Sequence, residues 1–233
     1  MTRGSTIVAL TVGLLVTSCA TGSGAASAPG ASAATVIQPG KAKEELLAGN
    51  QRYLAGGMHT HDWLNERIVK TGNFGQSPSV GVLSCADSRV PVELVFDQGV
   101  GDLFVVRLAG FVDSVEGTGT FEYGYLVLGM HSLVVLGHTK CGAVEATLEG
   151  KPLPGSIPSI AAAIAPGVSE QLAAAKQGKN AQLSQAAVKA NVLHQKKTLL
   201  ERSEVLKKAH AEGKLDVLCA IYDVETGAVS FLD

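Results

Sequence analysis

The sequence has 233 residues, of which 46% are hydrophobic and 17% charged, so it has enough apolar residues for one ordinary folded domain and is not generally disordered. Its 19 basic and 21 acidic residues give a formal net charge of −2, which lacks the basic excess of a nucleic-acid binder, and no nucleic-acid partner is expected. Four cysteines are too few for a disulfide-built scaffold of this length.

The N-terminal segment has the pattern of an export signal. A single basic residue precedes an apolar run at residues 7–16, which is too short to span a bilayer comfortably. The run ends in Val16-Thr17-Ser18-Cys19, which resembles a bacterial lipobox. We therefore predict a signal peptide over residues 1–18 and lipidation of Cys19. The alternatives are cleavage after residues 31–33, which would give a soluble secreted protein, and a retained transmembrane anchor.

The next segment, residues 19–40, is predicted to be a flexible tether. It consists almost entirely of Ala, Gly, Ser, Thr and Pro, and it has too little apolar bulk to offset the entropy lost on ordering. The folded domain is expected over residues 41–233. With a lipid on Cys19, this domain would be held at a membrane on the periplasmic or cell-surface side.

The domain alternates predicted helices with short apolar strands. Helical periodicity is found over residues 41–54, 62–69, 116–130, 142–148, 157–172 and 180–212. Apolar runs typical of strands occupy residues 79–84, 103–108, 132–137, 215–223 and 229–232. Buried strands that alternate with helices predict an α/β fold with a mostly parallel central sheet flanked by helices.

Polar clusters directly follow two of the predicted strands. The first is Cys85-Ala86-Asp87-Ser88-Arg89 and the second is His138-Thr139-Lys140-Cys141-Gly142. Functional groups gather at the carboxyl ends of strands in open α/β sheets, so adjacent strands would bring Cys85 and His138 together. Cys141 begins a helix, whose N-terminus favours a thiolate. Two thiolates and an imidazole suit tetrahedral zinc and leave a fourth position open, as in catalytic zinc sites.

Asp87 and Arg89 are the predicted helpers of this site. Two thiolates cancel the formal charge of Zn²⁺, so activation of a water molecule would need assistance. The Asp87 carboxylate would accept the proton of that water, and Arg89 would hold Asp87 through a bidentate, charge-assisted pair. If the pair breaks, Asp87 would move onto zinc, which makes it a candidate metal ligand as well as a catalytic residue.

These residues resemble the β-class carbonic anhydrases. The matching segments are residues 85–91, 93–99, 101–107 and 137–142, and a leading helix at residues 44–57 is also similar. The resemblance covers about residues 41–233. The two cluster motifs are specific as a pair, whereas either one alone would be a weak signal.

The resemblance implies a lyase that reversibly hydrates CO₂ to bicarbonate and a proton, with one Zn²⁺ per chain on Cys85, His138 and Cys141 and with Asp87 and Arg89 as a dyad. It implies that a homodimer or homotetramer forms. It further implies that substrate is contacted by Gln76, by the backbone of Gly142, and by Phe104 and Tyr123 across a dimer interface.

One departure from the family pattern concerns residues 109–111. The family usually has Ala-Gly-Asn at this place, and this chain has Ala109-Gly110-Phe111. We expect the change to affect the pocket mouth or the interface rather than zinc binding.

Two rival functions are compatible with the motifs. One is an enzyme of the same fold that hydrolyses a CO₂-like molecule such as COS or CS₂. The other is a non-catalytic zinc-binding or redox-sensing module, in which Cys85 and Cys141 store metal or form a disulfide. Asp87 and Arg89 argue against the second, because metal storage needs neither residue.

Overall fold

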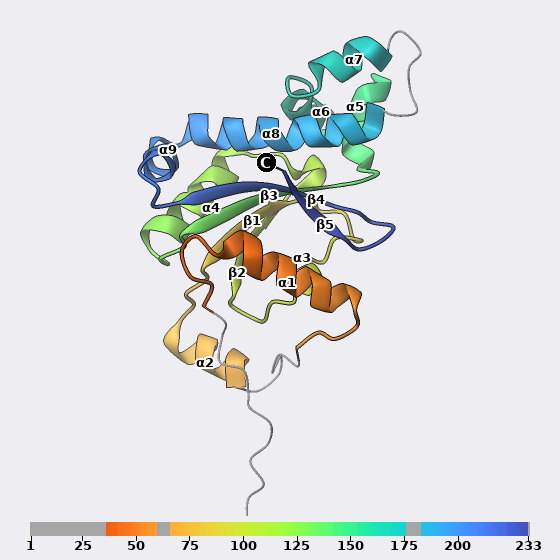
Figure 1. Ribbon diagram of the computed structural model, residues 1–233. Helices are drawn as coiled ribbons and strands as arrows, with labels where there is room; N and C mark the ends of the chain where they lie inside the picture. Colours follow the sequence, from red (N-terminus) through yellow and green to blue (C-terminus); the bar gives the residue numbers. More distant parts are fainter. Residues whose placement is uncertain (1–35, 60–65, 176–182, 233) are drawn as a thin grey trace, which may run out of the picture. The chain divides into compact units, whose positions relative to one another are not determined.

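The computed structural model describes residues 36–59, 66–175 and 183–232, which belong to one compact unit (Figure 1). The predicted signal peptide, Cys19 and most of the predicted tether lie outside the described residues. Ile37 is buried in the core beside the first helix, so the packed domain includes a residue that precedes position 41. Within the described ranges, no helix is both long enough and apolar enough to cross a membrane.

A five-stranded sheet with the order β2-β1-β3-β4-β5 forms the centre of the unit. The strands are β1 (Val80–Ser84), β2 (Leu103–Arg107), β3 (Ser132–His138), β4 (Asp216–Tyr222) and β5 (Val229–Leu232). The first four are parallel, and β5 is antiparallel to β4. Every residue of β1 and β3 is buried, which explains their continuous apolar runs. The predicted α/β fold with a mostly parallel sheet is confirmed.

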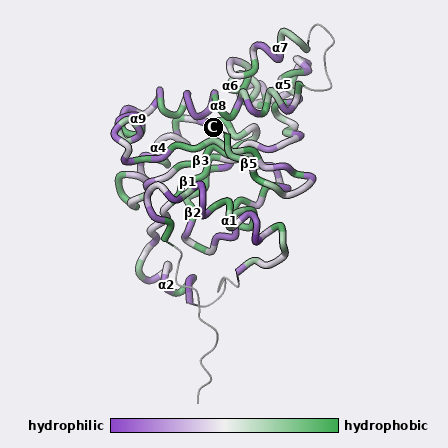
Figure 2. The backbone as a smooth tube through the Cα atoms, viewed as in Figure 1, coloured by the Kyte–Doolittle hydropathy of each residue, from purple (hydrophilic) through white to green (hydrophobic). Residues whose placement is uncertain are grey.

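Helices cover both faces of the sheet (Figure 1). One face packs against α4 (Val115–Leu126), α8 (Leu183–Arg202) and α9 (Glu204–Ala211), and the other against α1 (Ala42–Leu54) and α3 (Val92–Val95). The remaining helices are α2 (Glu66–Phe74), α5 (Gly142–Glu149), α6 (Ile157–Ile164), α7 (Ser169–Ala175) and the 3₁₀ turn η1 (Ala109–Phe111). Figure 2 shows hydrophobic residues along the strands and mixed colouring along the helices, as expected for a sheet buried between two helical layers.

The prediction of one continuous helix over residues 157–172 was wrong. The structure has two helices, α6 and α7, separated by Pro166 and Gly167. Proline lacks a backbone N–H and its ring clashes with the preceding helical turn, so the first helix ends there. Gly167 also lets the break approach α8, because a Cβ at this position would lie 2.5 Å from the Cβ of His194.

The prediction of one helix over residues 180–212 was also wrong. α8 ends at Arg202 and α9 begins at Glu204. Between them, Ser203 has an extended backbone (φ −114°, ψ 107°), and its hydroxyl accepts a hydrogen bond from the N–H of Leu206. The same hydroxyl donates to Glu122 Oε1 at 2.5 Å. A tertiary contact and an N-cap thus divide a segment whose periodicity alone looks continuous.

The other helix predictions differ at their ends. The helix predicted over residues 62–69 runs from Glu66 to Phe74, and residues 62–65 lie outside the described part. The helix predicted over residues 116–130 ends at Leu126, shortly before Gly129 takes a left-handed backbone (φ 79°). The short α3 and η1 were not predicted. α3 follows β1 in the chain and η1 follows β2.

Candidate metal centre

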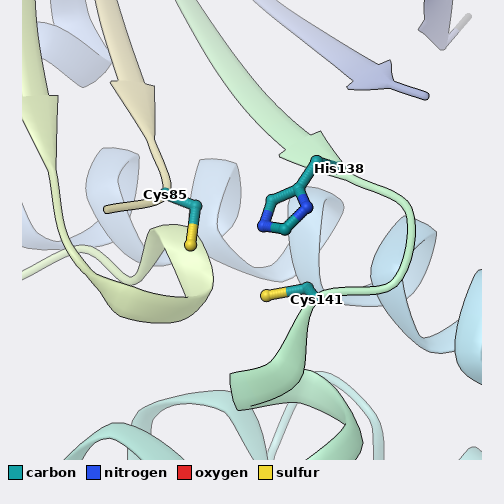
Figure 3. Close-up of side chains that lie close together, drawn as sticks. All are labelled: Cys85, His138 and Cys141. Atoms are coloured by element: carbon teal, nitrogen blue, oxygen red, sulfur yellow. The ribbon is translucent and has the colours of Figure 1, made fainter. Parts of the chain in front are cut away.

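Side chains of three ligand types meet at the carboxyl ends of β1 and β3. Cys85 follows the last residue of β1, His138 ends β3, and Cys141 is the N-cap of α5. β1 and β3 are parallel neighbours with Ser84 opposite Leu136, so both strands deliver their following residues to one edge. The ligand atoms of the three residues all lie within 4.8 Å of one another, and all three residues are buried. Figure 3 shows these side chains turned toward a common space.

The imidazole of His138 leaves one nitrogen free for a ligand. Its Nδ1 lies 3.0 Å from the carbonyl oxygen of Thr139, and because a carbonyl only accepts, Nδ1 carries the proton. Its Nε2 is buried and has no hydrogen-bond partner among the described residues. A buried nitrogen without a partner is costly unless something binds it, and a ring fixed through Nδ1–H is the usual arrangement of a metal-bound histidine.

The two cysteines share a proton in the metal-free chain. The Cys141 thiol donates to the Cys85 sulfur, and this bond, with the neighbouring His138 imidazole and the N–H groups of Asp87 and Gly110, lowers the pKa of Cys85 to about 4 despite burial. The neighbouring Cys85 thiolate and burial raise the pKa of Cys141 above its ordinary value. The N–H groups at the start of α5 act in the opposite direction but do not outweigh them. One thiolate is therefore ready for a cation, and a metal would displace the remaining proton.

Asp87 and Arg89 form the predicted pair at the mouth of this cluster. The Arg89 Nε and Nη2 atoms donate to the two carboxylate oxygens of Asp87 at 3.0 and 2.8 Å, and Arg89 N–H also donates to Oδ1 at 2.9 Å. These bonds lower the pKa of Asp87 to about 2. Arg89 donates a further bond to the Lys140 carbonyl at 3.1 Å. Asp87 Oδ2 lies 3.9 Å from His138 Nε2, so Asp87 is beside the three-residue cluster but is not one of its members.

Arg107 is a site residue that the sequence reasoning missed. It ends β2, and its Nε donates to the Cys85 carbonyl at 2.8 Å while its Nη2 donates to the Asp87 carbonyl at 2.6 Å. These two bonds fix the backbone that carries both Cys85 and Asp87. The sequence did contain a signal for this role. Arg107 is a basic residue at the carboxyl end of β2, and β2 is the neighbour of β1, the strand that leads into Cys85.

The predicted substrate-contacting residues fall into two groups. Gly142 adjoins Cys141, is exposed, and has no atom within 4 Å of the position that a Cβ would occupy. In contrast, Phe104 pairs with Gly81 near the start of β1, the Tyr123 ring lies 6.4 Å from the Phe104 ring, and Gln76 is exposed shortly before β1. These three residues therefore lie toward the end of the sheet opposite to Cys85 in the same chain. Their substrate contacts stay predictions.

Known proteins resemble this chain over most of its length. A family profile described as carbonic anhydrase matches residues 80–229. Carbonic anhydrase 2 of Mycobacterium tuberculosis is 34% identical over 202 residues, which are 84% of this chain and 93% of that protein. A carbonic anhydrase of Mycolicibacterium smegmatis is 41% identical over 135 residues, 56% of this chain and 65% of its own length.

Solved structures show the same resemblance in three dimensions. The β-carbonic anhydrase CafA of Aspergillus fumigatus superposes with a TM-score of 0.63 at 29% identity, over 80% of this chain and 88% of that chain. The β-carbonic anhydrase CcaA superposes with a TM-score of 0.62 at 26% identity, over 83% and 89% of the respective chains.

Proposed function

Because the chain belongs to the β class of the carbonic anhydrase family, we propose that it reversibly hydrates CO₂ to bicarbonate and a proton, with one zinc ion per chain. The observation that carries the proposal is the unpartnered Nε2 of His138, which is buried beside the sulfur atoms of Cys85 and Cys141. The intact Asp87–Arg89 pair at the same place favours catalysis over metal storage.

The donor set of the cluster fits zinc. Two cysteine sulfurs and an imidazole nitrogen, all buried, are donors that Zn²⁺ accepts in tetrahedral sites, and three protein ligands leave one position open. Cys85, His138 and Cys141 would hold the ion. When bound, zinc lowers the pKa of a water molecule toward about 7 and so supplies a nucleophile at neutral pH.

Residues of the chain would orient the reaction. Asp87 stays ionised at neutral pH and is held by Arg89, so its carboxylate is ready to accept a hydrogen bond from the attacking water. Arg107 fixes the carbonyl groups on either side of Ala86 and thereby the direction of Asp87. Gly142 is exposed at the start of α5, and its N–H would donate to charge that develops on a substrate oxygen.

A second copy of the chain would complete the substrate pocket. Phe104 and Tyr123 lie toward the end of the sheet opposite to the cluster of their own chain, so they would line a CO₂ pocket only in a partner. The same region exposes apolar side chains at the end of α4 and at its C-cap, namely Tyr123, Leu126 and Val127. Exposed apolar patches of this kind mark interaction surfaces. This supports a homodimer or a homotetramer built from such dimers.

Export and lipid anchoring are part of the proposal. They are supported by the apolar run at residues 7–16 and by the lipobox-like residues that end in Cys19. The exported protein would lie on the periplasmic or cell-surface side, where oxidising conditions threaten free thiols, and metal ligation would protect Cys85 and Cys141. Labelling with a radioactive fatty acid tests the anchor: Cys19→Ala should abolish the label, and label that persists in the variant contradicts lipidation at Cys19.

Stopped-flow measurement of CO₂ hydration tests the main proposal. Asp87→Ala should retain zinc and lose activity by roughly 100-fold or more, the usual contribution of a positioned proton acceptor. Asp216→Ala is the control, because Asp216 starts β4 and its carboxylate bonds only to the Gly40 N–H in the hydrogen bonds described. Wild-type protein that holds stoichiometric zinc but hydrates no CO₂ would contradict the proposal. Assays of COS and CS₂ hydrolysis would then separate the two rival functions.

A further inference from the structure

The segment of residues 109–113, which follows β2, has a backbone that its surroundings must hold in place. Gly110 and Phe111 both adopt left-handed conformations, with φ values of 71° and 46°. This conformation is uncommon for a bulky residue such as phenylalanine and persists only where neighbouring structure fixes it. Phe111 is completely buried.

This segment contacts two of the three candidate metal ligands. The Gly110 N–H donates a hydrogen bond to the Cys85 sulfur. The Phe111 ring meets the His138 imidazole edge-on, with ring centroids 6.4 Å apart and an interplanar angle of 71°. A small shift of segment 109–113 would therefore change both the electron density on a ligand sulfur and the packing of a ligand ring.

Two buried amide side chains of α8 hold the segment. Asn191 Nδ2 donates to the Gly110 carbonyl at 3.0 Å, and the Asp113 N–H donates to Gln195 Oε1 at 2.8 Å. Gln195 Nε2 donates in turn to Asn191 Oδ1 at 2.9 Å and to the Ala163 carbonyl at 3.1 Å. Neither amide side chain contacts the ligand atoms in any hydrogen bond described.

Asn191 and Gln195 are more deeply buried than polar side chains that only help to pack a helix usually are. Asn191 is 0% exposed and Gln195 is 1% exposed, and their neighbours Val188 and Val192 belong to the apolar core. A polar group in such surroundings is costly unless its hydrogen bonds are satisfied, and a fully bonded network fixes one geometry. Here, the hydrogen bonds of the network reach the Gly110 carbonyl before Phe111 and the Asp113 N–H after it.

We propose that Asn191 and Gln195 are positioning residues of the metal centre, which hold Gly110 and Phe111 in their left-handed backbone so that Gly110 N–H meets Cys85 and the Phe111 ring meets His138. The inference rests on the proposed zinc site. It assigns to α8 a role in metal retention and in the properties of the bound metal, although α8 supplies no ligand.

The test compares Asn191→Ala with Asn50→Ala in the cobalt-substituted full chain. Asn50 is the matched control: it is 3% exposed and it also bonds to backbone groups, namely the carbonyls of Val95 and Gly227 and the N–H of Val229. It lies in α1, on the other face of the sheet. Both variants should lower the melting temperature, but only Asn191→Ala should alter the metal centre.

In Asn191→Ala, the sulfur-to-cobalt charge-transfer band should move to longer wavelength, because the Cys85 sulfur would lose the N–H bond that stabilises its electrons. Loss of zinc to a chelator should also become about 10-fold faster, the lower end of the usual effect of groups that orient metal ligands. In Asn50→Ala, band position and chelation rate should equal those of the wild type.

A folded Asn191→Ala protein with the wild-type band and chelation rate would overturn the inference, as would equal changes in Asn50→Ala. If Asn191→Ala does not fold, Gln195→Leu carries the same expectation, because it keeps the volume and removes the bonds to Asp113 and Asn191. The wild type tests the proposed function separately. Wild type with a normal cobalt spectrum but no CO₂ hydration would contradict the function and leave the comparison of variants intact.

Discussion

Cys85 and Cys141 differ in protonation although they are adjacent in the same cluster. Cys85 has a pKa of about 4 because the Cys141 thiol donates to it, whereas the pKa of Cys141 is raised beside that thiolate. In the metal-free protein we therefore expect the ultraviolet absorbance of one thiolate to appear as the pH rises through about 4, far below the ordinary thiol value of about 8.5. A spectrophotometric pH titration measures this step.

Cys85→Ser should remove the low-pH step in that titration. Cys219→Ser should leave it unchanged, because Cys219 is buried in β4 and burial raises its pKa. A wild-type protein that shows no thiolate below neutral pH would contradict the shared proton and would mean that the two sulfurs are not in contact without metal.

Arg107 allows a second prediction at the level of single residues. Its guanidinium bonds to the carbonyls of Cys85 and Asp87, so Arg107→Met should loosen the turn that carries a candidate metal ligand and the proposed proton acceptor. We expect kcat/KM for CO₂ hydration to fall by about 10-fold or more, since small misplacements of reacting groups are costly. Zinc content should change little, because these bonds end on backbone carbonyls and Arg107 bonds to no candidate ligand atom in the hydrogen bonds described.

Arg67→Met is the control for this prediction. Arg67 makes comparable bonds, to the Val100 carbonyl and to the Asp102 carboxylate, but these lie in the loop before β2 and not at the cluster. This variant should lose stability and keep its kcat/KM. Equal activity of Arg107→Met and the wild type would show that the turn needs no support from β2.

Among the secondary-structure elements, the strands that are buried along their whole length were the easiest to predict from the sequence. β1 and β3 are apolar because both of their faces are covered, so their runs and the polar residues that follow them were sufficient to place Cys85, His138 and Cys141 at one edge. Periodicity alone missed the break at Pro166, although the proline itself was a sequence signal for it. The break at Ser203 and the left-handed turn at Gly110 and Phe111 had no such local signal, because Ser203 bonds to Glu122 and Gly110 to Asn191, which are distant in the sequence.

The helix start at Ser203 gives a prediction at the level of elements. Its hydroxyl caps α9 by accepting from the Leu206 N–H and donates to Glu122 in α4. Ser203→Ala should lower the free energy of unfolding by about 1 kcal/mol, the typical cost of a lost N-cap, as measured by urea denaturation. Ser203→Thr should recover part of this loss, because a threonine hydroxyl can also act as an N-cap. A loss in the threonine variant equal to that of alanine would assign the effect to packing instead.

For the molecule as a whole, the described chain holds the candidate metal ligands at one end of the sheet and the predicted apolar pocket residues toward the other. The carboxyl end of β1 leads into Cys85, while Phe104 and Tyr123 adjoin its beginning. Phe104 and Tyr123 would therefore line a pocket beside the cluster of a partner chain and not beside the cluster of their own chain, as the proposed dimer requires. The family resemblance anticipates this separation by placing Phe104 and Tyr123 across a dimer interface, although Phe104 lies in the same motif region as Cys85 in the linear sequence.

The exposed face of α4 then predicts how assembly and activity are linked. Tyr123, Leu126 and Val127 are 51%, 63% and 62% exposed in the single chain, which is unfavourable for a surface that stays in water. In a two-fold dimer each substitution acts twice, so Leu126→Glu should place two carboxylates at the interface and dissociate it. We expect analytical ultracentrifugation at micromolar concentration to show a monomer, and hydration activity to fall to about a tenth or less while zinc content is unchanged, because the cluster is intact but lacks the partner's pocket wall.

Val205→Glu is the matched control, since Val205 is an exposed apolar residue of α9 and lies outside the α4 face. It should change neither mass nor activity. A Leu126→Glu monomer with full hydration activity would mean that no second chain contributes to the pocket, and Phe104 and Tyr123 would then be residues of the interface or core alone. A variant that remains dimeric and active would place the interface elsewhere, most directly on the exposed apolar residues of α2, Ile68, Val69 and Phe74. Because metal content is measured on the same samples, loss of activity through a damaged cluster is distinguished from loss of the partner.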